Sequence, residues 1–272
     1  MRISEKNGPI GVFDSGIGGL TVANAVKRLL PNEKLIYFGD TAHLPYGDKS
    51  ATAIRGYSLR IARFLLEREC KMVVIACNTA SSVAYTAVKK QCGASVPVVN
   101  VIDPMVQYVT GKYGDAKVGV IGTKGTISSR VYVRKIRKIS PESQVTSLAT
   151  PLLAPMIEEG YFNNHISKTI IHSYLEKSNL QDIKALILGC THYPLIKKEL
   201  ESFYKKKTEV IDSSEIVAQF VQQRLMKKGL LSDRKKAGSS QFFVSDYTKA
   251  FEESTRLFFP GEVQLKKAAI WD

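Results

Sequence analysis

Short runs of apolar, mostly β-branched residues alternate along this chain with longer segments whose apolar residues recur every three or four positions. The short runs are typical of strands buried on both faces, and the longer segments are typical of amphipathic helices. Strands joined by helices form parallel sheets, so the pattern predicts an α/β fold. In the first hundred residues we expect strands at 10–13, 35–38, 72–76 and 96–101, and helices at 20–30, 51–68 and 80–91.

The order of elements then repeats in the second half of the chain. VGVIGTKGT resembles IGVFDSGIG, and ALILGCTHY resembles VVIACNTAS, with a cysteine just past a strand in both halves. Any α/β chain shows some echoes of this kind, but the matched cysteines favour a duplicated architecture. We therefore expect two pseudo-symmetric parallel-sheet α/β domains. The second half has predicted strands at 117–121, 145–148, 185–188 and 209–211, and predicted helices at 131–139, at 164–177 and around 216–225.

The last segments of the chain have no counterpart in the second half. They comprise a basic loop at 227–240, a strand at 242–244, a helix at 247–258 and a last strand at 263–270. We expect them to complete the first domain. The predicted domains are therefore 1–98 plus 208–272 for the first and 99–207 for the second, which suits a chain of 272 residues.

Composition and charge narrow the class of protein. An apolar fraction of 44% and a charged fraction of 24% are ordinary for a globular protein. No apolar run approaches the roughly 18 residues of a membrane span, and the first residues lack a secretory h-region, so we expect no membrane partner and a cytoplasmic protein. None of the four cysteines forms a CxxC pair, so we expect no metal site.

The net charge of +14 makes a nucleic-acid partner an alternative to consider. The basic residues are scattered, with clusters at 134–138, 205–207 and 234–236, and no aromatic residues interleave with them on one face. We interpret them as a solvated surface and expect no nucleic-acid partner. A basic, non-catalytic nucleic-acid-binding α/β protein stays the alternative from another class.

Two cysteines carry the first candidate chemistry. Cys77 and Cys190 each follow a predicted strand, at the sheet edge where α/β proteins place ligands, and each precedes a predicted helix. A helix N-terminus favours a thiolate, so we expect both thiols to have a lowered pKa. A buried cysteine is also a common small apolar filler, which is our interpretation of Cys70 and Cys92.

The first strand ends in a second candidate feature, Asp14 and Ser15 followed by a glycine-rich turn. The turn lacks the G-x-G-x-x-G spacing, so we reject NAD binding. Glycines there let the backbone approach a small anion, and Asp14 could assist a nearby base or merely cap the helix. The loop at 44–47 lies on the same edge, and its proline and glycine also suit a simple turn.

DSGIGG, DTAHLPYG, ACNTAS and GCTHYP, in this order, resemble the cofactor-independent glutamate racemases of bacterial cell-wall synthesis. The resemblance covers about residues 8–218 and implies two stacked α/β domains with the active site in the cleft between them. It implies that Cys77 takes the Cα proton of D-glutamate and Cys190 that of L-glutamate, with no cofactor. An aspartate racemase of the same fold stays an alternative.

The resemblance also implies which side chains assist. Asp14 matches a helper near the first cysteine, His192 matches one near the second, and Glu158 fits a third better than its neighbour Glu159. The substrate would be glutamate, and we expect a homodimer. The substrate contacts carried over are Asp14, Ser15, Tyr46, Gly47, Asn78, Thr79, Thr191 and His192, with Thr123 added because its turn mirrors that of Ser15.

Overall fold

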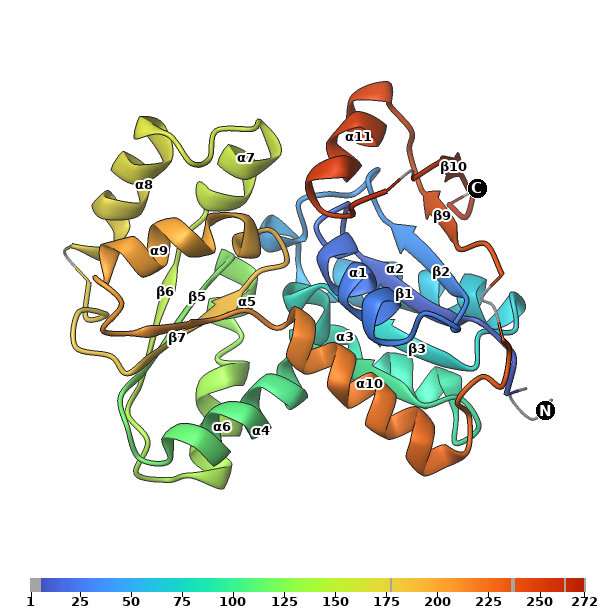
Figure 1. The fold of residues 1–272 in the computed structure, drawn as a ribbon, viewed down its shortest axis with the longest axis horizontal. Helices are drawn as coiled ribbons and strands as arrows, with labels where there is room; N and C mark the ends of the chain where they lie inside the picture. Colours follow the sequence, from blue (N-terminus) through green and yellow to red (C-terminus); the bar gives the residue numbers. More distant parts are fainter. Residues whose placement is uncertain (1–5, 177, 236–237, 262, 272) are drawn as a thin grey trace.

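Each of the two lobes of the molecule is built around a parallel β-sheet (Figure 1). The computed structural model describes residues 6–176, 178–235, 238–261 and 263–271. The sheet of the first lobe has the order β10-β9-β2-β1-β3-β4, and every pair of neighbours in it is parallel. Its strands are β1 (Ile10–Asp14), β2 (Leu35–Gly39), β3 (Met72–Ile75), β4 (Val98–Asn100), β9 (Gln241–Val244) and β10 (Leu265–Lys267).

Helices cover both faces of this first sheet. Side chains alternate across it, so Ile10 and Val12 pack into one core while Phe13 packs into the other. Helices α1 and α10 pack together over the first of these cores, and α2 packs with α3 over the second. The helices of this lobe are α1 (Leu20–Leu29), α2 (Ala51–Glu67), α3 (Asn78–Cys92), α10 (Ser214–Lys228) and α11 (Lys249–Ser254), with short 3₁₀ turns η1 (Tyr46–Asp48) and η3 (Thr255–Leu257).

The second sheet repeats the centre of the first. Its order, β6-β5-β7-β8, matches β2-β1-β3-β4 strand for strand, and its neighbours are also parallel. The predicted α/β class and the predicted pseudo-symmetry are therefore confirmed. The elements of this lobe are α4 (Ile102–Tyr113), β5 (Val118–Gly122), α5 (Lys124–Ser128), α6 (Val131–Ile139), β6 (Val145–Ala149), α7 (Leu153–Glu158), α8 (His165–Leu175), β7 (Ala185–Gly189), η2 (Tyr193–Ile196), α9 (Lys197–Phe203) and β8 (Glu209–Ile211).

The structure differs from the sequence prediction at several boundaries. Strand β8 pairs with β7, so the second sheet extends beyond residue 207, where we placed the end of the second domain. The predicted strand 263–270 is a strand only at Leu265–Lys267, and the predicted helix 247–258 divides into α11 and η3. Residue 177 of a predicted helix and residues 236–237 of the predicted basic loop lie outside the described residues.

The ends of the central strands position the candidate site. In the first sheet β1 ends at Asp14 and β3 at Ile75, and in the second sheet β5 ends at Gly122 and β7 at Gly189. The residues that follow these four strands line one cavity, together with residues of the loop after β2 and of α7. No helix among the described residues is long and apolar enough to cross a membrane.

Candidate active site

A cavity of about 180 Å³ lies between the two lobes. Ser15, Cys77 and Asn78 reach it from the first lobe, and Glu158 and Cys190 reach it from the second. Every site residue predicted from the sequence lines this cavity except Asp14. The full lining is Ser15, Gly16, Leu44, Pro45, Tyr46, Gly47, Cys77, Asn78, Thr79, Thr123, Ala154, Pro155, Glu158, Gly189, Cys190, Thr191 and His192.

Cys77 is the N-cap residue of α3, so its sulfur lies at the start of the helix. The backbone N–H of Ala80 donates to Cys77 Sγ at 3.4 Å, and the thiol donates to Ser15 Oγ at 3.7 Å. Burial, followed by the nearby carboxylate of Asp14, raises the pKa of Cys77 to about 12. Our expectation of a lowered pKa is therefore wrong for Cys77, because burial outweighs the helix N-terminus. A pKa this high favours the thiol of Cys77 over the thiolate at neutral pH.

Cys190 lies on the opposite lobe and belongs to a chain of polar contacts. Its Sγ lies 3.6 Å from Nδ1 of His192, and Nε2 of the same ring lies 2.8 Å from Oε1 of Glu158. Burial opposes a charge on His192, but the contacts with Cys190 and Glu158 outweigh it and hold the pKa of His192 well above its ordinary value. The raised pKa favours the charged form of the His192 ring, which lies directly beside the sulfur of Cys190.

The sequence left open whether Glu158 or Glu159 faces the site. Glu158 is partly buried at the last position of α7 and reaches His192, whereas Glu159 is exposed. The contact to the histidine therefore belongs to Glu158.

Asp14 lies behind the cavity wall rather than in it. Its side chain is completely buried, its Oδ2 accepts from the backbone N–H of Gly16 at 3.0 Å, and its Oδ1 accepts from Thr191 Oγ1 at 3.4 Å. Burial raises the pKa of Asp14, while His192 and the backbone N–H groups of Gly16 and Gly19 act in the opposite direction. The carboxyl group of Asp14 can therefore act on Cys77 and His192 electrostatically, although it does not line the cavity.

The glycines of the first turn serve contacts within the protein. A Cβ on Gly18 would lie 2.5 Å from Cε1 of His192, and a Cβ on Gly19 would lie 2.4 Å from Cβ of Asp14. We expected these glycines to let a ligand approach the backbone closely. At Gly18 and Gly19, however, the space that a Cβ would fill lies against the side chains of His192 and Asp14.

Threonines of both lobes meet at one side of the cavity. Thr79 Oγ1 lies 2.8 Å from Thr123 Oγ1 and 3.1 Å from Thr126 Oγ1, and Thr123 also caps α5 by accepting from the N–H of Thr126. A Cβ on Gly47 would lie 2.8 Å from Cβ of Thr123, so the two lobes approach closely there. Thr79 and Thr123 therefore hold the lobes together as well as lining the cavity.

Tyr46 lies in the loop after β2 and is almost completely buried. Its hydroxyl donates to Asp40 Oδ2 at 2.6 Å, and Asp40 Oδ1 accepts from Ser245 Oγ at 2.7 Å. Asp40 therefore fixes the loop that carries Tyr46 and Gly47 to the strand end of β9. The hydroxyl proton of Tyr46 is already committed to Asp40, which leaves its ring and the backbone beside it to face a ligand.

Sequence analysis missed three residues that shape this site from behind. Asp40 anchors Tyr46, the hydroxyl of Tyr37 donates to the backbone oxygen of Gly16 at 2.7 Å, and the hydroxyl of Tyr132 donates to Asn78 Oδ1 at 2.7 Å. Tyr37 lies on β2 and Asp40 directly follows it. The apolar run of β2 indicates only that the strand is buried, so it does not show that these two side chains support the site. Tyr132 lies on α6 of the other lobe, and nothing in its local sequence connects it to Asn78.

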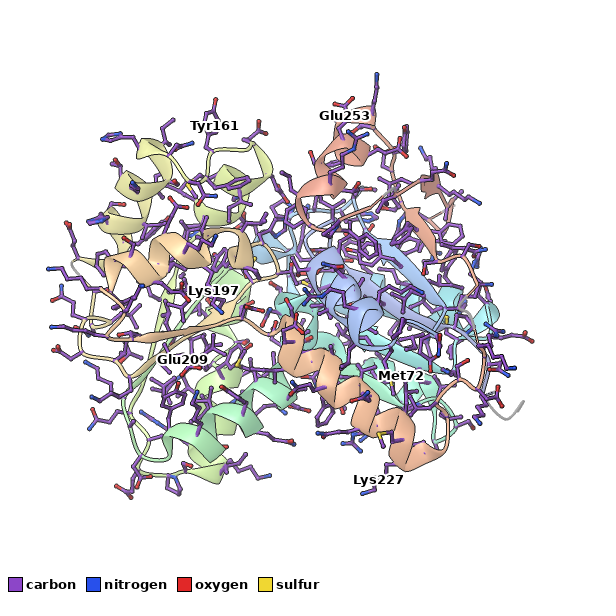
Figure 2. All side chains as sticks on the ribbon, in the orientation of Figure 1. Met72, Tyr161, Lys197, Glu209, Lys227 and Glu253 are labelled. Atoms are coloured by element: carbon purple, nitrogen blue, oxygen red, sulfur yellow. The ribbon has the colours of Figure 1, made fainter. Side chains whose placement is uncertain are left out.

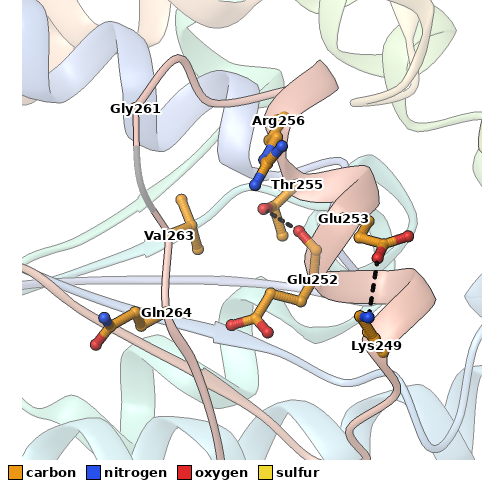
Figure 3. Close-up of a pocket in the computed structure, with 8 residues that line it drawn as sticks. All are labelled: Lys249, Glu252, Glu253, Thr255, Arg256, Gly261, Val263 and Gln264. Atoms are coloured by element: carbon orange, nitrogen blue, oxygen red, sulfur yellow. Dashed lines mark hydrogen bonds and ion pairs between the residues drawn. The ribbon is translucent and has the colours of Figure 1, made fainter.

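A second hollow, of about 690 Å³, lies beside α11 on the first lobe (Figure 3). None of the predicted site residues lines it. Glu252 there already accepts from the hydroxyl of Tyr247 and the backbone N–H of Leu265, and Lys249 pairs with Glu253 at 3.9 Å. Three of its charged side chains thus already have partners within the protein, and we do not assign a function to it.

Basic side chains are spread over both lobes. Lys197 and Lys227 lie on different lobes, far apart in the view of Figure 2. Several lysines are paired with acids, as in Lys197 with Asp212 at 3.4 Å and Lys135 with Asp103 at 2.5 Å. Among the described residues, no group of three or more His, Cys, Asp or Glu side chains could hold a metal ion.

Comparison with known proteins agrees with this geometry. The family model for Asp/Glu/Hydantoin racemases matches residues 18–221. The chain is 41% identical to a glutamate racemase of Geobacter metallireducens, over 93% of each chain. It superposes on the crystal structure of glutamate racemase from Francisella tularensis in complex with D-glutamate with a TM-score of 0.92 and 38% identity, covering 98% of this chain and 99% of the other. The chain therefore belongs to the Asp/Glu/Hydantoin racemase family and, within it, to the glutamate racemases.

Proposed function

We propose that this protein interconverts L- and D-glutamate without a cofactor, by proton transfer at Cα between two cysteines. The observation that carries the proposal is that Cys77 and Cys190, from opposite lobes, line one small cavity. Racemisation removes the Cα proton from one face and returns a proton to the other, so it needs a base and an acid on opposite sides of the substrate. The D-glutamate in the related Francisella tularensis structure supports glutamate as the substrate.

In the proposed reaction with L-glutamate, the thiolate of Cys190 takes the Cα proton and the thiol of Cys77 gives its proton to the other face. One C–H bond breaks, one forms, and the thiolate passes from Cys190 to Cys77. Two features support this starting state: the raised pKa of Cys77, which favours its thiol, and the contact of 3.6 Å between Sγ of Cys190 and Nδ1 of His192, which gives Cys190 a partner for its proton. With D-glutamate the two roles exchange.

The Cα–H of an amino acid is a very poor acid, so the site must stabilise the carbanion. Hydrogen-bond donors at the substrate carboxylate would strengthen as negative charge moves onto it. Asn78 offers such a donor, because its Nδ2 is buried and without a hydrogen-bond partner among the described residues. Displacement of water from the cavity by the substrate would strengthen these interactions further.

The biological setting follows from the same proposal. A D-amino acid of this kind would supply peptidoglycan synthesis, and the enzyme would work in the cytoplasm on a free small molecule. The expected homodimer stays a prediction, which light scattering on the purified protein would test.

The experiment that tests the function is circular dichroism of purified protein incubated with each enantiomer of glutamate and of aspartate, without added cofactor. We expect the signal of either glutamate enantiomer to decay to zero. In deuterium oxide, the product enantiomer should carry one deuterium at Cα. Decay with aspartate alone would contradict the proposed substrate, and racemisation without solvent label would contradict the two-base mechanism.

A further inference from the structure

Asn78 lines the cavity, and its buried side-chain amide has a hydrogen-bond partner at its oxygen but none among the described residues at its nitrogen. Oδ1 of Asn78 accepts from the hydroxyl of Tyr132 at 2.7 Å, while its Nδ2 has no partner within the described part of the chain. The side chain of Asn78 is 2% exposed and that of Tyr132 is 3% exposed. A buried amide group without a partner costs free energy, so the structure keeps an unpaired donor at the cavity wall.

Tyr132 decides which way this amide points. Burial raises the pKa of the Tyr132 hydroxyl far above its ordinary value, so the hydroxyl keeps its proton and donates. If the amide were flipped, its N–H groups would face a hydroxyl whose own proton would then lack an acceptor. The observed orientation satisfies the hydroxyl and turns both N–H bonds of Asn78 away from Tyr132.

The contact also crosses between the lobes. Asn78 is the first residue of α3 in the first lobe, directly after Cys77, whereas Tyr132 belongs to α6 of the second lobe. Tyr132 does not line the cavity itself. It can therefore act on a ligand only through Asn78.

We infer that Tyr132 is a positioning residue, which orients the Asn78 amide so that Nδ2 donates to a carboxylate of the bound amino acid. The inference rests on the proposed function for the identity of that ligand. The second lobe, which carries Tyr132, would thereby help to bind the substrate carboxylate that Asn78 of the first lobe contacts. Nδ2 is a donor, so the group that it binds must carry a hydrogen-bond acceptor, and a carboxylate oxygen meets this requirement.

The test compares Tyr132→Phe, which removes one oxygen, with the wild type. Loss of one oriented hydrogen bond should weaken binding about tenfold. We expect KM for both glutamate enantiomers to rise by about this factor and kcat to fall as well, because the same donor strengthens when negative charge moves onto the carboxylate in the transition state. Tyr204→Phe is the matched control, since Tyr204 is buried in the same lobe and its hydroxyl has no hydrogen-bond partner in the described structure.

A double-mutant cycle separates positioning from a general structural effect. In an Asn78→Ala background, Tyr132→Phe should cause no further rise in KM. A full, additive rise in that background, or an unchanged KM in Tyr132→Phe alone, would overturn the inference. NMR of the Asn78 side-chain amide, specifically labelled with ¹⁵N, gives an independent readout. Its signal should shift on removal of the hydroxyl, and an unchanged signal would also overturn the inference.

Calorimetric titration with D-glutamate distinguishes a failure of the positioning role from a failure of the proposed function. If the wild type binds D-glutamate but does not racemise it, the proposed function fails, and the Kd of Tyr132→Phe still decides the positioning role. If the wild type racemises glutamate and Tyr132→Phe binds it equally well, only the positioning role fails.

Discussion

Nε2 of His192 lies 2.8 Å from Oε1 of Glu158, at the wall of the cavity between the two lobes. The other ring nitrogen lies 3.6 Å from Sγ of Cys190. The pair is therefore placed to keep positive charge beside one of the two sulfurs. Cys77, on the opposite lobe, has Ser15 and a backbone N–H beside its sulfur instead. The two halves of the site repeat in topology but differ in electrostatics.

The first prediction concerns the two thiols. Cys77→Ser and Cys190→Ser should each lower kcat at least about 100-fold, since each removes a general acid–base group and a hydroxyl is far less acidic. Circular dichroism with both glutamate enantiomers measures the loss. Cys92→Ser is the control, because Cys92, the last residue of α3, is also buried but does not line the cavity. Wild-type kcat in either cavity variant would contradict the two-base mechanism.

The second prediction concerns pH and the His192–Glu158 pair. The folded pKa of His192 is raised, so the pair contributes stability that is fully present below the unfolded pKa of about 6.5 and is lost as pH rises through the folded value. Glu158→Gln should therefore destabilise the protein by about 1 kcal/mol at neutral pH, and the difference should shrink in alkaline solution. Thermal unfolding over this range measures it.

Glu159→Gln is the control for that series, because Glu159 is the exposed neighbour. It should follow the wild type at every pH. A difference between wild type and Glu158→Gln that grows with rising pH would contradict the sign of the effect.

The central strands and the two cysteine turns could be predicted because their signals are local. A continuous apolar run such as 72–76 marks a strand buried on both faces, and a cysteine after it lies at the ligand-bearing edge. Helix α4 was not predicted from the sequence. Its Pro104 is compatible with a helix, because it lies in the first turn, where the N–H that proline lacks would have no partner within the helix.

The remaining features depend on how the lobes dock, which no local pattern contains. The raised pKa of Cys77 follows from its burial in the folded chain and from Asp14, whereas the sequence shows only the helix start. Tyr132 reaches Asn78 across the same interface. Strand β8 shows a third limit, since its pairing with β7 moves the end of the second sheet past the predicted boundary.

The third prediction concerns the close approach of Gly18 and His192. A Cβ at position 18 would lie 2.5 Å from Cε1 and 2.6 Å from Nδ1 of the ring, so Gly18→Ala must displace His192. A shift of about 1 Å in a catalytic group can cost about 100-fold in rate, and we expect kcat to fall by that order. Steady-state kinetics measure the loss, and thermal unfolding shows whether the fold is retained.

Gly111→Ala is the matched control for Gly18→Ala. Gly111 lies within α4, with no atom within 4 Å of an added Cβ, so the substitution should stabilise the protein by about 0.5–1 kcal/mol and leave kcat unchanged. Full activity in Gly18→Ala would show that His192 can move without cost to the reaction.

The fourth prediction concerns a buried ion pair remote from the cavity. Lys71 Nζ lies 2.6 Å from Glu33 Oε2 and donates to the backbone oxygen of Lys6, and both charged side chains are almost completely buried. Lys71→Met leaves the Glu33 carboxylate buried without its cation, so we expect a loss of about 3–5 kcal/mol in the free energy of unfolding. Urea unfolding measures it.

Lys249→Met, which breaks the exposed pair with Glu253, is the control and should change stability by less than about 1 kcal/mol. Equal losses in the two variants would contradict the view that burial makes the unpaired carboxylate costly.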